Sequence, residues 1–377
     1  MTGTHLSSTH PPLHPTTEED TVNRLRLLRS RRVGVATYYR LLAEHQTAAR
    51  ALDALPQIAK EAGVANYHIC SLDQAQAEMA DGQAAGARLL VAGSPDYPTS
   101  LNDLADAPPL LWALGRTELI RKPMIAIVGA RNASSLGTRM AKRLAEDLTA
   151  QGFVVVSGLA RGIDTAAHHG ALAGGTIAVQ AGGVDVIYPA ENATLAQDIA
   201  SQGLRLSEAP MGLQPQARHF PARNRIISGL ARAVVVVEAA AKSGSLITAR
   251  NALDQARDVL AVPGHPFDAR AAGCNMLLRD GAILVRNAAD VIEALAPLAT
   301  DSEESPTLPL PPSPQNLRQV AALHDMILSR LGPAPIAEDQ LLRDIAAPAT
   351  SIAPVLVDLE LDGKIMRQAG GLLARVV

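Results

Sequence analysis

The chain has 377 residues, of which 47% are hydrophobic and 2% aromatic, and its formal net charge is −3. This length predicts two or three domains, because one hydrophobic core rarely serves more than about 250–300 residues. The slightly negative charge excludes a globally basic protein that coats DNA, so any nucleic-acid site must be a local cationic patch. The low aromatic content likewise excludes a stacking platform built from many rings.

The sequence carries no sign of export. Cys70 and Cys274, the two cysteines, lie far apart, as is typical of a protein in a reducing cytoplasm. Residues 1–20 are rich in Pro, Thr and His and lack an apolar stretch, which predicts a disordered tail and not a signal peptide. We expect no membrane span, because no apolar run reaches the roughly 18 residues that one requires.

Residues 21–115 predict a helical domain. Leu and Ala recur there at helical spacing, and Gly34 before residues 37–42 suggests a helix–turn–helix hairpin. A proline-rich approach over residues 94–109 then leads to Trp112 and Gly115.

Residues 116–296 predict an extended Rossmann-like, doubly wound α/β domain. Short β-branched runs alternate there with helical segments, and such runs are typical of strands buried on both faces of a parallel sheet. The expected strands are residues 125–128, 154–156, 177–179, 234–237, 259–262 and 283–285. Residues 138–151 and 246–257 are expected to be crossover helices.

The C-terminal part predicts a linker and a winged helix. Residues 297–316 contain six prolines beside acidic residues, a composition that cannot pack. Residues 317–377 show three helical patterns and a hairpin, as in a winged helix–turn–helix domain. The third helix, near residues 351–362, carries Asp358, Glu360 and Asp362, which DNA phosphates would repel. We therefore expect this module to bind protein or its own chain and not a duplex sequence.

Ligands of a parallel sheet bind at the carboxyl ends of its strands, where loops lead into helix starts. The loop 128–135 lacks the glycine spacing of a dinucleotide fingerprint. Gly129 permits a tight turn there, a serine can cap the next helix, and Arg131 would project over the helix's positive end. A helix cap with a surface arginine is the alternative interpretation.

Two further loops contain paired glycines. In the loop 157–164, Gly158 and Gly162 permit backbone N–H groups to approach an anion. Asp164 and His168 share a helix face, but nothing at metal spacing completes a ligand shell, so we expect a capping aspartate and a packed or hydrogen-bonded histidine. The loop 181–192 offers glycines again, and Glu191 there is expected in a helix start.

The loop 241–248 follows the strongest predicted strand. Lys242 superficially suggests a nucleotide-hydrolysing P-loop, but Val237 occupies the position of the required glycine. A helix start with serines, a lysine and free amides instead suits a bound phosphate.

Residues 209–237 contain no Asp or Glu but hold four arginines and Phe220. Arginine forks match phosphate oxygens and a ring gives a base something to stack on, so this segment indicates nucleic acid. A basic surface turn is the alternative interpretation. No loop supplies a nucleophile with a base and an orienting group, which favours binding over catalysis.

The motifs occur in a specific order: residues 129–131, 157–164, 220–229 and 243–249, then 263–264 and 273–275. This series resembles the DNA-processing protein A (DprA, also called Smf) family throughout the α/β domain. The helical region resembles that family's sterile-alpha-motif-like domain, and the winged helix is a common appendage. Gln180 and Ala231 depart from the family pattern without touching the expected contacts.

The resemblance implies a cytoplasmic homodimer that binds single-stranded DNA during natural transformation, protects it and helps to load the RecA recombinase. It implies no metal, no cofactor and no nucleotide hydrolysis. A nucleotide-processing enzyme of a related α/β fold and a winged-helix transcription regulator are the alternatives.

The DNA-binding residues that the resemblance carries over lie in the loops described above. They are Gly129, Arg131, Ser157, Gly158, Phe220, Arg223, Asn224, Arg225, Lys242, Ser243, Gly244 and Ser245. Among them, phosphate contacts are expected from Arg131, Arg223, Arg225 and Lys242. The amides near Gly244 are expected to cradle a phosphate, Phe220 to stack on a base, and Asn224 to contact a base edge or to hold its loop.

Overall fold

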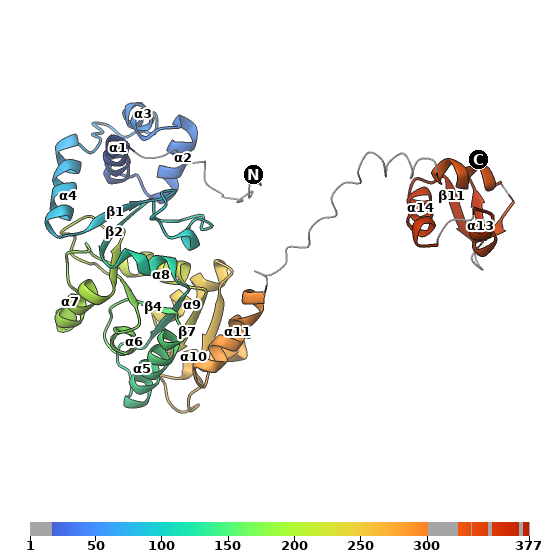
Figure 1. Cartoon of the computed structure of the whole chain (residues 1–377). Coiled ribbons are helices and arrows are strands. Elements are labelled where there is room, and N and C mark those ends of the chain that lie inside the picture. Colours follow the sequence, from blue (N-terminus) through green and yellow to red (C-terminus); the bar gives the residue numbers. More distant parts are fainter. Residues whose placement is uncertain (1–16, 301–322, 333, 346–348, 369–371, 377) are drawn as a thin grey trace. The chain divides into compact units, whose positions relative to one another are not determined.

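The computed structural model describes residues 17–300, 323–332, 334–345, 349–368 and 372–376, which Figure 1 shows with their labels. The chain divides into two compact units between Ala299 and Thr300, and each is described by itself. None of the helices in these ranges combines the length and the apolar character that a membrane crossing requires.

A nine-stranded sheet organises the first unit, with the strand order β1-β2-β6-β5-β4-β3-β7-β8-β9. The strands are β1 (Arg88–Val91), β2 (Leu110–Gly115), β3 (Met124–Gly129), β4 (Val154–Ser157), β5 (Thr176–Val179), β6 (Leu204–Ser207), β7 (Ala233–Val237), β8 (Asp258–Ala261) and β9 (Ile283–Leu284). Strands β3 to β9 pair in parallel, whereas β1 and β2 pair antiparallel at one edge. The chain order reverses between β4–β3 and β7, which makes the carboxyl end of β3 a topological switch point.

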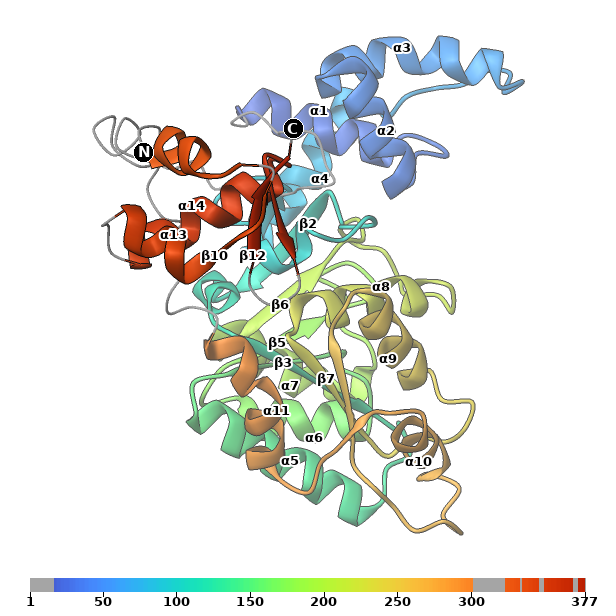
Figure 2. The ribbon, with the colours of Figure 1, turned by 90° about the vertical axis from the view of Figure 1, so that its right-hand side faces the viewer.

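The central strands are buried on both faces, as their unbroken apolar runs predict. On β3, Ile125 and Ile127 face one hydrophobic cluster, whereas Ala126 and Val128 face another. Helices cover both clusters, and Figure 2 shows α8 and α9 on one side of the sheet with α5 and α11 on the other. The expected doubly wound α/β architecture is confirmed.

The helices of this layer surround the sheet in chain order. They are α5 (Ser135–Ala150), α6 (Ile163–Ala171), α7 (Ala193–Gln202), α8 (His219–Leu230), α9 (Ser245–Asp254), α10 (Ala272–Arg279) and α11 (Ala288–Thr300), with the short 3-10 helices η1 (Thr99–Leu101), η2 (Thr117–Arg121) and η3 (Ala190–Asn192). The six strands expected from the sequence are all present. Strands β1, β2 and β6 were not expected, and β6 escaped the pattern because the buried Arg205 interrupts its apolar run.

Four N-terminal helices form the expected helical region, α1 (Glu18–Arg29), α2 (Val35–His45), α3 (Ala48–Glu61) and α4 (Leu72–Ala84). They join the sheet through a buried contact, since Trp112 Nε1 on β2 donates to Glu78 Oε1 at 2.9 Å and Glu78 also pairs with Arg29 at 2.8 Å. The sheet begins before residue 115, because residues 88–115 contribute β1 and β2. A division at residue 115 therefore does not separate the helical layer from the sheet.

The second unit has the expected winged-helix arrangement. A helix over residues 323–330 is followed by β10 (Ile336–Ala337), α13 (Glu338–Ile345), α14 (Ala349–Leu361), β11 (Ile365–Gln368) and β12 (Leu372–Arg375), and the strands form a sheet of order β10-β12-β11. Ile327, Leu341 and Leu356 pack in its core. The expected linker starts at residue 297 inside α11, and most of it lies outside the described residues. The expected tail ends inside α1, and residues 1–16 of it also lie outside them.

Candidate nucleic-acid interface

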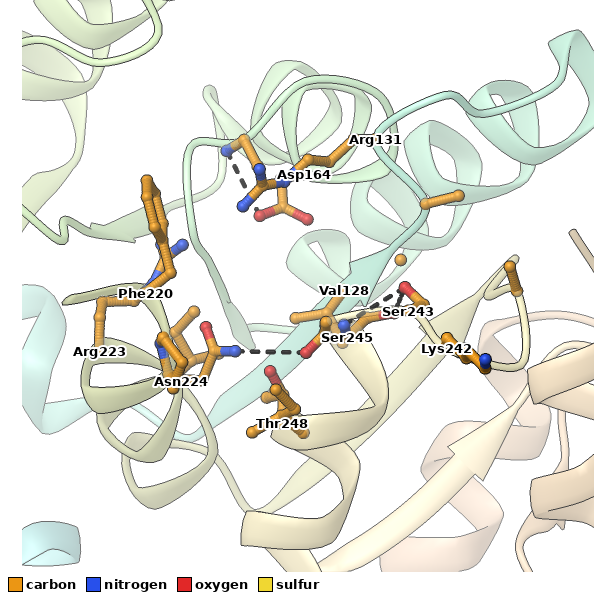
Figure 3. Close-up of a pocket in the computed structure, with 18 of the residues that line it drawn as sticks. Val128, Arg131, Asp164, Phe220, Arg223, Asn224, Lys242, Ser243, Ser245 and Thr248 are labelled. Carbon is orange, nitrogen blue, oxygen red and sulfur yellow. Dashed lines mark hydrogen bonds between the residues drawn. The ribbon is translucent and has the colours of Figure 1, made fainter. Parts of the chain in front are cut away.

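A cavity of about 780 Å³ opens at the switch point of the sheet. Its walls come from the carboxyl end of β3 and from the first turns of α8 and α9, with a contribution from the loop before α6 (Figure 3). Four segments distant in the sequence therefore meet at one edge of the sheet. This is the position at which parallel sheets bind their ligands.

Two exposed cations border the cavity. Arg131 follows β3 and Lys242 precedes α9, and Figure 3 shows Phe220 on one side of the cavity and Lys242 on the other. Within the part of the chain that the structure describes, neither cation is in an ion pair. Arg270 also lines the cavity, but Asp268 Oδ1 lies 3.1 Å from its Nε. Arg131 and Lys242 are thus available to an anion.

Phe220 presents the aromatic surface of the cavity from the first turn of α8. The guanidinium carbon of Arg131 lies 5.1 Å from its ring centroid, at cation–π distance. One turn later, Asn224 Nδ2 donates to the backbone oxygen of Gly244 at 3.3 Å, which ties α8 to the start of α9. Of the two roles expected for Asn224, the structure shows that of holding the loop.

The start of α9 is capped by hydroxyl groups and not by a carboxylate. Ser243 Oγ lies 2.7 Å from Ser245 Oγ and accepts from the Ser245 amide at 3.4 Å. Among the described residues, the Gly244 amide has no hydrogen-bond acceptor. The positive end of α9 therefore faces the cavity without an internal counter-charge.

The start of α5, below Arg131, differs in this respect. Ser134 caps the helix by accepting from the Gly137 amide at 3.0 Å. The carboxylate of Glu238, at the end of β7, accepts from the Ser134 amide at 2.8 Å and from the Ser134 hydroxyl. An internal anion already occupies this helix start, and the sequence gave no signal for Glu238.

Arg223 lies in the floor of the cavity and not at its rim. It is 5% exposed, and its Nη1 donates to the backbone oxygens of Gly158 and Val179, each at 2.6 Å. Burial lowers the pKa of Arg223 to about 10, and the nearby Asp164 carboxylate opposes that shift. The expected phosphate contact of Arg223 is corrected to a structural role beneath the site.

The loop 157–164 directs its amides inward as well. Asp164 Oδ2 accepts from the amides of Gly158 at 3.0 Å and Ala160 at 3.4 Å, and burial raises the pKa of Asp164 although Arg223 opposes this. Ser157 is fully buried and donates to the backbone oxygen of Ile127 at 2.6 Å. The anion that these amides bind is the protein's own carboxylate, so the expected approach of an external phosphate at this loop is corrected.

His168 is packed and hydrogen-bonded, as expected. Its Nε2 accepts from the Leu159 amide at 3.2 Å, and its Nδ1 lies 2.7 Å from Thr176 Oγ1. Because the Thr176 hydroxyl itself donates to Val155, Nδ1 must carry the proton. Burial lowers the pKa of His168 to about 3, so the ring is neutral. Within the described ranges, no group of three or more His, Cys, Asp or Glu could hold a metal ion.

Arg225 lies outside the cavity. It is on α8, but its side chain is 12% exposed and pairs with Asp106 at 3.1 Å and with Glu208 at 2.7 Å. Its expected phosphate contact is therefore corrected, because two carboxylates already neutralise the charge. Glu208 ends one residue before the acid-free segment, and Asp106 is far away in the sequence, so local composition concealed both partners.

Gly129 belongs to the cavity wall for a steric reason. A Cβ atom at this position would lie 1.9 Å from the backbone oxygen of Val237 on the neighbouring strand. Gly244, in contrast, has open space around its missing Cβ. The structure thus brings Gly129, Arg131, Phe220, Arg223, Asn224 and residues 242–245 together around one cavity, with Gly158 and Ser157 beneath it.

Family models agree with this architecture. Residues 88–296 match the model of the DNA recombination-mediator protein A family, residues 18–80 match a DprA-like N-terminal HHH domain, and residues 311–371 match a DprA winged helix domain. The chain is 46% identical to the DNA processing protein DprA of Streptococcus pneumoniae over 198 residues, which are 52% of this chain and 70% of that protein. It is 36% identical to protein Smf of Synechocystis over 316 residues, which cover 75% of this chain and 79% of that one.

Solved structures of relatives give the same result. The X-ray structure of the Streptococcus pneumoniae protein superposes with a TM-score of 0.57 at 35% identity and covers 73% of this chain and 93% of its own. A Helicobacter pylori DNA processing protein A, whose structure gives insight into its single-stranded DNA binding mode, has a TM-score of 0.52 at 32% identity and covers 56% of this chain and 96% of its own. The chain therefore belongs to the DprA/Smf family of DNA recombination-mediator proteins.

Proposed function

We propose that this protein binds single-stranded DNA in the cavity at the carboxyl edge of its sheet. The observation that carries the proposal is that the unpaired Arg131 and Lys242 border the same cavity as the Phe220 ring and the open start of α9. Cations for the backbone beside a ring for a base are the two components of single-strand binding. The single-stranded DNA binding mode of the Helicobacter pylori relative supports the same ligand.

The position of the ring favours an unpaired strand over a duplex. Phe220 is half-buried in the wall of the cavity, so a base must leave its stack to reach it. A base in a duplex is held by its partner and its neighbours, whereas a base in a single strand is free to enter. The cavity is therefore suited to the less structured polymer.

The acid and the histidine nearest to the cavity favour binding over hydrolysis. Asp164 accepts two backbone amides, and both ring nitrogens of His168 are engaged in hydrogen bonds. Neither group is free to activate a water molecule. The enzyme alternative is tested by incubating the protein with nucleotide monophosphates, where release of a free base would support it.

Salt dependence tests the binding site directly. Each lost phosphate contact should reduce the log–log slope of affinity against salt by about 0.7 for a single strand. Arg131→Ala and Lys242→Ala should both weaken oligo-dT binding in fluorescence anisotropy and flatten that slope. Lys122→Ala is the matched control, because Lys122 is exposed just before β3, at the opposite edge of the sheet. Slopes that match the wild type for both cavity variants would refute the site.

We further propose that the protein is a cytoplasmic homodimer that protects incoming DNA and helps to load RecA during natural transformation. These roles follow from the family to which the chain belongs and from the proposed ligand. Bound DNA should resist an added nuclease, and RecA should assemble faster on DNA covered by a single-strand-binding protein when this protein is present. Arg131→Ala should reduce both effects, and light scattering of the free protein tests the dimer.

We propose a different partner for the winged helix. Asp358 and Glu360 are exposed on α14, and Arg367 of the following strand lies 3.5 Å from Glu360 and also pairs with Glu338. The acidic surface that would face DNA keeps its own cation occupied, which favours a protein partner or another part of this chain. A gel shift with residues 315–377 tests this, because tight and sequence-selective duplex binding would support the transcription-regulator alternative.

A further inference from the structure

A second cavity, of about 260 Å³, lies on the other side of Phe220. Arg131, Phe220 and Arg223 line both cavities, so these side chains form the partition between them. The second cavity is completed by the loops 157–164 and 181–192, which follow β4 and β5. It is therefore continuous with the proposed DNA site and lies along the same edge of the sheet.

The second cavity has an aromatic ring of its own. Tyr188 is 50% exposed, and its ring centroid lies 5.7 Å from that of Phe220 with the two planes inclined by 52°. Most other large rings are used in the cores, since Tyr38, Tyr97 and Trp112 are all buried. A tyrosine left half-exposed against a second ring at the edge of a cavity has an open surface on which a planar ligand can stack.

The same cavity contains a weakly held cation. Arg161 Nε lies 3.7 Å from Glu191 Oε2, and the two side chains are 62% and 64% exposed. A pair this long and this open to water contributes little and is screened by salt. A phosphate that approached Arg161 would compete with one exposed carboxylate, in contrast to Arg225, which two carboxylates hold at shorter distance.

We propose that the second cavity is a separate nucleotide subsite, in which Tyr188 stacks on one base while Phe220 stacks on the adjacent base. Arg161 contacts a phosphate there, and the strand crosses the partition beside Arg131. This inference rests on the proposed single-stranded DNA function and specifies its ligand. The site then requires an oligonucleotide of at least two residues, and a mononucleotide fills only one of its two halves.

Glu191 gives the subsite a test with the opposite sign. Its carboxylate both occupies Arg161 and repels a phosphate at that position, so Glu191→Gln should strengthen oligo-dT binding and steepen its salt dependence. Arg161→Gln should weaken binding and reduce the log–log slope by about 0.7. Arg161→Lys, which keeps the charge, should retain the wild-type slope.

Tyr188→Leu and Tyr188→Phe separate stacking from the hydroxyl group. The leucine variant should raise the Kd for oligo-dT roughly fivefold or more without a change in salt slope, since loss of stacking is not ionic. The phenylalanine variant keeps the ring and should bind as the wild type does. Photocrosslinking of oligonucleotides with 5-iododeoxyuridine at successive positions should give adducts at Phe220 and Tyr188 from neighbouring nucleotides.

The outcomes distinguish this inference from the function on which it rests. If the wild type fails to bind oligo-dT, or if Arg131→Ala and Lys242→Ala bind it normally, the proposed function fails. If those two variants weaken binding but Tyr188→Leu, Arg161→Gln and Glu191→Gln all match the wild type, only the second subsite is wrong. Crosslinks to Phe220 without any to Tyr188 would also overturn the subsite.

Discussion

The rim and the floor of the main cavity use the same kinds of side chain for opposite purposes. At the rim, Arg131 and Lys242 are exposed and carry no internal partner within the described residues. In the floor, Arg223 and Asp164 are buried and are satisfied by backbone groups. The comparison shows that a charged side chain near a ligand site serves binding only where the protein has not already neutralised it.

The same contrast separates the two helix starts beside β3. The start of α5 holds the Glu238 carboxylate, whereas the start of α9 holds only serine hydroxyls. A helix N-terminus attracts an external anion when no internal anion occupies it. Substitutions in the floor should therefore change the free energy of unfolding, and substitutions at the rim should change DNA affinity.

The largest effect is expected for Arg223→Met. The substitution removes the donor from the Gly158 and Val179 oxygens and leaves the buried Asp164 without its nearby cation. Loss of one member of such a buried charged network should lower the free energy of unfolding by about 3–5 kcal/mol. Urea denaturation measures this, with Arg131→Met as the matched rim control. Equal stability of the two variants would show that the floor and the rim do not differ as described.

The next effect is expected for Phe220→Ala, now on affinity. Loss of a stacked ring should weaken oligo-dT binding by about 1–3 kcal/mol while the salt slope stays the same. Phe220→Tyr keeps the ring and should retain the affinity. A change in slope for Phe220→Ala would indicate that the ring acts by positioning Arg131, whose guanidinium lies over it, and not by stacking.

The fold was largely predictable because its signal is local. Unbroken apolar runs such as residues 125–128 and 234–237 identify buried parallel strands wherever they occur. The prediction failed where polar residues are buried in a strand, as with Arg205 of β6. Arg205 Nε donates to Gln180 Oε1 at 2.7 Å, so each of the two polar residues satisfies the other and neither follows the pattern.

The position of the site was also predictable, but the roles of its arginines were not. Arg131, Arg223 and Arg225 look equivalent in the sequence, since each lies in a segment poor in acidic residues. Their partners are Phe220 for the first, backbone oxygens for the second, and Asp106 and Glu208 for the third. These contacts join distant segments, so only the folded arrangement reveals which arginine is free.

A smaller effect of the floor is expected from pH. The pKa of His168 is lowered to about 3 by burial, so the unfolded chain binds a proton that the folded chain excludes. Stability should therefore fall as the pH drops below the ordinary histidine pKa, by about 1 kcal/mol between about pH 7 and about pH 5.5. Denaturation at both pH values measures the loss, and His168→Gln should remove most of it. A wild type as stable at the lower pH would contradict a neutral, buried ring.

The smallest effect on stability is expected for Gly244→Ala at the rim. Its φ of −62° and ψ of −22° suit alanine, and open space surrounds the missing Cβ. The entropy lost by the unfolded chain and the weaker helix cap oppose each other, so stability should change by no more than about 0.5 kcal/mol. Oligo-dT affinity should nevertheless fall, because the methyl group would stand beside the amide that is proposed to hold a phosphate. Gly158→Ala gives the contrast in the floor, where the new Cβ would lie 2.1 Å from Arg223 Nη1 and should destabilise the fold. Equal stability losses for the two alanine variants would remove the distinction between a floor that is packed and a rim that is open.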